Sequence, residues 1–80
     1  MDRSAILACL TEMFRGIFDD DALELTPATA AADVPGWDSM THITIVVEAE
    51  RRFGVKFQTS EIESLRNVDD FLTLIGKKRG

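Results

Sequence analysis

The sequence contains few of the residue types that build metal sites, disulfides or membrane segments. Its 80 residues include one cysteine, one histidine, two prolines and no tyrosine. The single Cys9 excludes an internal disulfide and a cysteine-based metal cluster, which suits a reducing compartment. The longest apolar run, residues 5–10, is too short to span a bilayer, and no secretory signal pattern accompanies it. We therefore expect a cytoplasmic protein with no metal site.

Basic residues are also scarce, with nine Lys and Arg against fourteen Asp and Glu and a net charge of -5. This balance disfavours nucleic acid and anionic membranes as partners and favours basic protein surfaces. The composition, 45% hydrophobic and 29% charged, is typical of a soluble globular domain, and 80 residues suffice for one small domain. We expect one domain over residues 1–80, free-standing and monomeric.

Apolar periodicity predicts three longer helices. They cover residues 3 to about 18, 38 to about 53, and 67 to about 75, with apolar residues at three- and four-residue steps. Gly76 is expected to end the last helix. The loop over residues 19–36 shows no sustained period and is expected to wrap the bundle. Its expected anchors in the core are Leu23, Leu25 and Val34.

A short additional helix is predicted between the second and last long helices. Ser60 and Glu63 are spaced as a capping box, and this helix would bury Ile62 and Leu65. No segment alternates with period two, so strands are not expected. The predicted fold class is all-α, a four-helix bundle of three longer helices and one short helix with a long loop between the first two.

The second predicted helix carries two apolar stripes when its residues are placed 100° apart. One stripe would face the core and contains Ile45, Val46, Ala49 and Phe53. The other would lie exposed beside Ser39 as a docking surface and contains Met40, Ile43 and Val47. The alternative is that a wide core buries both stripes.

Ser39 lies where the long loop meets this helix. Pro35 and Gly36 shape the approach, and Asp38 can cap the helix. Ser39 is then a polar first-turn residue, a nucleophile with His42 as base, or an attachment site where the helix N-terminus favours a phosphate. The enzyme interpretation is disfavoured because His42 shares the core-facing angle, Asp38 is needed as the cap, and a small bundle has little room for a cleft.

In this position, Asp38-Ser39-Met40 resembles the Asp-Ser-Leu motif of acyl carrier proteins, and the resemblance covers nearly the whole chain. It implies that the chain is not an enzyme. A phosphopantetheinyl transferase would use Mg²⁺ and coenzyme A to attach 4′-phosphopantetheine to Ser39, next to Asp38. The thiol of that arm would hold acyl groups as thioesters.

The resemblance also implies partners. Besides the transferase, these are an acyl or aminoacyl ligase or acyltransferase, and a ketosynthase or other thioester-using enzyme. The implied pathway is secondary-metabolite (polyketide-like) or fatty-acid-like. Two alternatives are a D-alanyl or other aminoacyl carrier and an unmodified helical adaptor.

The expected partner surface lies on the exposed side of the second helix. Fatty-acid carriers, which this chain resembles, are rich in acidic residues there, whereas this chain has Arg51 and Arg52 where acids are usual. We therefore expect docking that relies more on apolar contact and depends less steeply on salt. The surface residues are Met40, Thr41, Ile43, Thr44, Val47 and Glu48.

Overall fold

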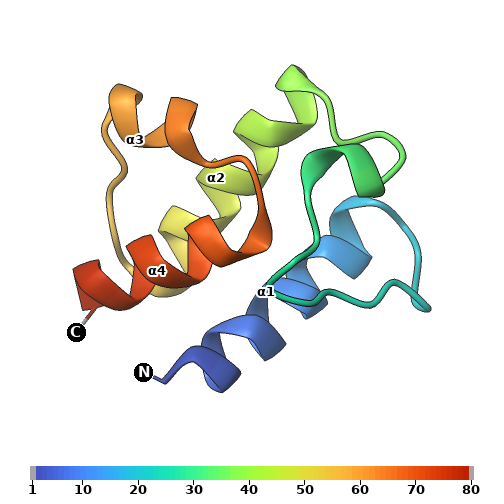
Figure 1. Cartoon of the computed structure of the whole chain (residues 1–80), viewed down its shortest axis with the longest axis horizontal. Coiled ribbons are helices and arrows are strands. Elements are labelled where there is room, and N and C mark those ends of the chain that lie inside the picture. The colour runs from blue at the N-terminus through green and yellow to red at the C-terminus, as the bar shows by residue number, and fades with distance from the viewer. Residues whose placement is uncertain (1, 80) are drawn as a thin grey trace.

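The computed structural model describes residues 2–79 and shows four α-helices joined by loops (Figure 1). The helices surround one apolar core. Within these residues no strand forms, and an isolated bridge joins Ala30 to Asn67. The predicted all-α class, with three longer helices, one short helix and a long first loop, is confirmed. The elements in chain order are α1 (Arg3–Ile17), the 3₁₀ helix η1 (Ala31–Asp33), α2 (Ser39–Phe53), α3 (Thr59–Ser64) and α4 (Val68–Arg79).

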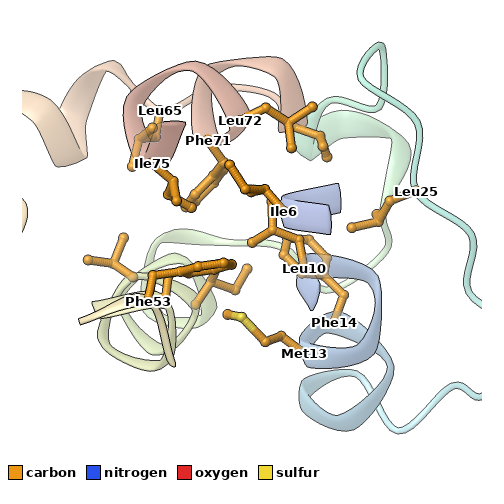
Figure 2. Close-up of a cluster of buried hydrophobic side chains, with 14 of the residues drawn as sticks. Ile6, Leu10, Met13, Phe14, Leu25, Phe53, Leu65, Phe71, Leu72 and Ile75 are labelled. Carbon is orange, nitrogen blue, oxygen red and sulfur yellow. The ribbon is translucent and has the colours of Figure 1, made fainter. Parts of the chain in front are cut away.

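The core forms where α1 packs against both α2 and α4 (Figure 2). The apolar face predicted for the last helix is buried throughout, and so is the core-facing stripe predicted for α2. Burial of large aliphatic and aromatic side chains is the main source of stability in so small a domain. The fully or almost fully buried side chains of α1 and α4 are Ile6, Leu10, Met13, Phe14, Val68, Phe71, Leu72 and Ile75.

The long loop between α1 and α2 is held against the start of α4. The carbonyl oxygens of Thr29 and Pro27 accept hydrogen bonds from the N–H groups of Val68 and Asp69, at 2.8 and 3.0 Å. The first N–H groups of a helix have no partner inside it, so the loop supplies acceptors that α4 lacks. The loop therefore wraps the bundle, as predicted.

The predicted loop anchors are confirmed to different degrees. Leu25 and Val34 are buried, whereas Leu23 is only partly buried against the core. The helix η1 was not predicted, because three alanines in a row carry no periodic signal. Its start is held by the Asp33 carboxylate, which accepts a hydrogen bond from the Ala30 N–H at 2.9 Å.

The predicted capping box of the short helix is wrong. Helix α3 begins at Thr59, and the Glu61 carboxylate accepts a hydrogen bond from the Gln58 N–H at 2.7 Å. The same carboxylate lies 2.9 Å from the Lys78 ammonium on α4. Its pKa is lowered mainly by the hydrogen bond from the Gln58 N–H and further by the hydrogen bond from Lys78. This register gives one carboxylate two partners, while Glu63 is exposed.

The short helix also buries less than predicted. Leu65, its C-terminal capping residue, is buried, but Ile62 is only half-buried and faces a groove described below. Residue Asn67 caps α4, since its side-chain oxygen accepts the Asp70 N–H at 2.8 Å.

The predicted end of the last helix at Gly76 is also wrong, because α4 continues to Arg79. A Cβ on Gly76 would lie 3.8 Å from Ile6 Cδ1, an ordinary van der Waals distance, so residue 76 packs against α1 while the helix continues. Continuation places Lys77, Lys78 and Arg79 in the last turn, where cations interact favourably with the helix dipole.

Candidate functional site

The turn before α2 determines where the helix begins. Gly36 has a φ of 91°, a left-handed conformation that glycine adopts without strain. The Asp38 carboxylate accepts the Thr41 N–H at 2.9 Å, and the Asp38 carbonyl accepts the His42 N–H at 2.8 Å. Asp38 is therefore the N-terminal cap of α2, as predicted, and Ser39 is its first helical residue.

Asp38 and Ser39 differ in what they can still bind. The hydrogen bond from the Thr41 N–H is the main cause that lowers the pKa of the Asp38 carboxyl, so this group is a charged cap at neutral pH. Ser39 is exposed beside it. The structure thus places a solvent-accessible hydroxyl at a helix N-terminus, where backbone dipoles favour negative charge.

The only histidine does not act as a base for Ser39. His42 is half-buried, and its Nδ1 accepts a hydrogen bond from the Trp37 indole Nε1–H at 3.1 Å. Its Nε2 lies 3.1 Å from the Ile62 carbonyl oxygen, which can only accept, so we assign the proton to Nε2. Both ring nitrogens are engaged, and among residues 2–79 no hydrogen bond joins His42 to Ser39.

Trp37, which donates this hydrogen bond to His42, is buried among aromatic rings. It is only 8% exposed, and its ring meets Phe14 edge-on with centroids 5.2 Å apart. The rings of His42 and Phe71 lie 6.1 and 6.3 Å from it. Trp37 is thus packed against α1 and α4, and its hydrogen bond to His42 joins the loop to α2.

A groove of about 450 Å³ opens beside Ser39. Its mainly apolar lining lies between the start of α2 and the α3 region, and the His42 bond to the Ile62 carbonyl connects the two sides. The groove can receive a flexible chain that begins at the Ser39 hydroxyl. Its lining includes Trp37, Ser39, His42, Ile43, Ile62 and Leu65.

The second apolar stripe of α2 is exposed, as predicted. Met40, Ile43 and Val47 are 80%, 51% and 57% exposed, so the alternative of a core that buries both stripes is wrong. Of the other predicted surface residues, Thr44 is exposed, and Thr41 and Glu48 are partly buried. All six of these side chains lie on α2, the helix that begins at Ser39.

Glu48 is less available to a partner than its sequence position indicates. Its carboxylate lies 2.8 Å from Arg52 Nε and 3.6 Å from Arg51 Nη2, and the Arg52 bond is the main cause that lowers its pKa. The four-residue spacing of Glu48 and Arg52 is a readable signal for such a pair. This pairing was missed when Glu48 was predicted as part of the docking surface.

Sequence reasoning also missed the link through His42. The hydrogen bond to the Ile62 carbonyl spans 20 residues of sequence, and a backbone acceptor leaves no side-chain signal. The five-residue spacing of Trp37 and His42 is only a weak signal for the hydrogen bond between their side chains. Glu63 and Arg66, which also line the groove, were not predicted as site residues.

Among residues 2–79, no helix is both long enough and apolar enough to cross a membrane. In the same part of the chain, no cluster of three or more His, Cys, Asp or Glu side chains has a geometry suited to a metal ion.

Comparison with known proteins identifies the family. Residues 10–75 match the family model described as "Phosphopantetheine attachment site". The chain is 36% identical over 73 residues to an acyl carrier protein of Myxococcus xanthus, covering 91% of this chain and 92% of that protein. An acyl carrier protein of Micrococcus luteus is also 36% identical over 73 residues, covering 91% of this chain and 90% of that protein.

A solved structure extends the likeness to three dimensions. The solution structure of a holo acyl carrier protein from Geobacter metallireducens has a TM-score of 0.83 and 42% identity, covering 90% of this chain and 83% of that chain. The chain therefore belongs to the acyl carrier proteins, non-catalytic carriers with a phosphopantetheine attachment site.

Proposed function

We propose that Ser39 is the residue that carries phosphopantetheine. The observation that supports this most strongly is the exposed hydroxyl at the first residue of α2, directly after the Asp38 cap. Ser39 also lies inside the segment matched by the family model, residues 10–75. Ser4 and Ser60 are also exposed first-turn serines, and Ser4 lines a groove of about 440 Å³, but the groove beside Ser39 has the more apolar lining.

The residues around Ser39 fit this prosthetic group. A phosphodiester at the start of α2 would meet the positive end of the helix dipole. Asp38 holds the helix start, and the apolar groove between α2 and α3 gives an arm attached at Ser39 a surface to lie against. When bound, the group supplies a terminal thiol that holds acyl groups as thioesters.

The chain needs no catalytic base of its own for this role. His42 is occupied by Trp37 and Ile62, and Asp38 is occupied as a cap. Activation of the Ser39 hydroxyl therefore belongs to the transferase, which moves the group from coenzyme A in the presence of Mg²⁺. The protein acts as substrate and tether.

The acyl-bearing arm would be presented to enzymes that dock on the exposed face of α2. We propose an acyl ligase or acyltransferase that loads the arm and a ketosynthase or related enzyme that uses the thioester, in a polyketide-like or fatty-acid-like pathway. An aminoacyl cargo would use the same arm and the same face. The cytoplasmic location, the monomeric state and the extent of the domain, residues 1–80, stay predictions.

Intact mass spectrometry tests the attachment residue. Incubation of the folded chain with coenzyme A, Mg²⁺ and a promiscuous phosphopantetheinyl transferase should add one phosphopantetheine. Ser39→Ala should abolish the addition, because Ser39 is the first helical residue of α2 and lies beside the mainly apolar groove.

Ser4→Ala and Ser60→Ala are matched controls, since each removes an exposed serine from the first turn of another helix. Both variants should still be fully modified. Addition that survives in Ser39→Ala would place the group elsewhere, and a folded wild-type chain that accepts no group would support an unmodified adaptor.

A further inference from the structure

The apolar stripe of α2 ends in a cluster of positive charge. Met40, Ile43 and Val47 follow one another at three- and four-residue steps, and the next four-residue step reaches Arg51. The Arg51 side chain is 79% exposed. A surface that is apolar near Ser39 thus becomes cationic at the far end of the helix.

A second groove, of about 440 Å³, lies at this end of α2. Val47 and Val55 contribute apolar side chains to it, and Arg51 and Lys56 contribute cations. Arg79 of α4 adds a third cation, because its Nη1 lies 4.0 Å from the position that a Cβ on Gly54 would occupy. Gly54 itself lines the groove.

The acidic side chains near this groove already have partners within the protein. Glu50 also lines it, but its carboxylate accepts the Phe57 N–H at 2.8 Å. Glu48 pairs with Arg52 at 2.8 Å. Lys56 is exposed. The Arg51 guanidinium lies 3.6 Å from the Glu48 carboxylate, which also pairs with Arg52.

We propose that this end of α2 binds an acidic, amphipathic segment of a partner enzyme, whose apolar side chains cover Val47 and Val55 and whose carboxylates meet Arg51 and Lys56. The inference rests on the proposed carrier function, in which partner enzymes dock on α2. It goes further because it specifies the sign of the partner's charge, which is opposite to what the net charge of -5 favours.

The test uses the whole ¹⁵N-labelled chain and two short helical peptides as probes. In one peptide, pairs of leucine residues alternate with pairs of glutamate residues. The other peptide has lysine in place of every glutamate. The acidic peptide should shift the amide signals of Val47, Arg51, Val55 and Lys56, and added salt should weaken its binding. The basic peptide should instead shift signals of the acidic block at residues 19–21.

Charge reversal identifies the groups responsible. Arg51→Glu with Lys56→Glu should weaken the acidic peptide about tenfold, the effect expected for two exposed ion pairs. Lys77→Glu makes the same change in net charge as Arg51→Glu alone, at an exposed position outside both grooves beside α2, and should alter the affinity less than about twofold.

Several results would overturn the proposal. The basic peptide could bind the same four residues with equal affinity, or the acidic peptide could shift signals elsewhere and not at these residues. The double variant Arg51→Glu with Lys56→Glu could also bind the acidic peptide as tightly as the wild type does. Equivalent shifts on raising the concentration of the chain alone would make a second copy the occupant. Ser39→Ala should leave peptide binding unchanged, so this test can fail or succeed independently of the attachment residue.

Discussion

The two faces of α2 carry similar apolar side chains in opposite environments. Ile45 and Val46 are no more than 2% exposed, whereas Ile43 and Val47 are more than half exposed. Residue type therefore does not decide burial on this helix. The angle around the helix decides it, because one face meets α1 and the other faces solvent beside Ser39. The buried face stabilises the fold, and the exposed face remains available to partners.

The largest expected effect comes from the buried face. Phe53→Ala should reduce the free energy of unfolding by about 3–5 kcal/mol, because it leaves a cavity at a side chain that is 3% exposed. This loss is a large part of the stability of an 80-residue domain. Urea denaturation measures it, and Val47→Ala is the control, expected to change stability by less than about 0.5 kcal/mol. Similar losses in the two variants would contradict the division into faces.

A smaller effect on a different property is expected from the exposed face. Val47→Asp should reduce the kcat/KM of the transferase about tenfold, as loss of a central interface residue typically does, while the circular dichroism spectrum stays unchanged. Ala8→Asp puts the same charge at an exposed position of α1 and should leave the kinetics unaffected. If Val47→Asp were loaded at the wild-type rate, the stripe would not be a docking surface for this enzyme.

The smallest expected effect concerns Asp38, the N-terminal cap of the helix that carries both faces. The pKa of Asp38 is lowered in the folded state, chiefly by the Thr41 N–H, so the unfolded chain binds more protons at acid pH. The stabilisation by Asp38 is therefore present above its ordinary pKa and is lost as the pH falls through the lowered value. Asp38→Ala should lower the melting temperature at pH 7, with a difference from wild type that shrinks below about pH 4.

Asp38→Asn provides the matched control for this titration. An asparagine can cap the helix without an ionisable group, so most of the stability at pH 7 should remain. The melting temperature of Asp38→Asn should lack the acid-dependent contribution of residue 38. A constant difference between wild type and Asp38→Ala from pH 7 to about pH 2 would show that the carboxylate charge does not stabilise the helix start.

Much of α2 was predictable because its signals are local. The Asp38 cap, the left-handed Gly54 after Phe53 and the two apolar stripes all depend on residues within one or two turns of one another. The two wrong boundaries show the limit of such signals. Ser60 and Glu63 have the spacing of a capping box, but Glu61 binds the Gln58 N–H at the start of α3 and also contacts Lys78 of α4. Gly76 resembles a helix end, yet α4 continues through it to Arg79.

The sequence by itself determined the helices, the exposed serine at the start of α2 and the family resemblance, because caps and periodicity act between near neighbours along the chain. Only the tertiary structure decided what meets the ends of α2 and α4. The His42 link to the Ile62 carbonyl, the support of α4 by the loop, and the approach of Arg79 to Gly54 join residues distant in sequence. Such contacts depend on how the helices pack, and spacing along the chain does not encode them.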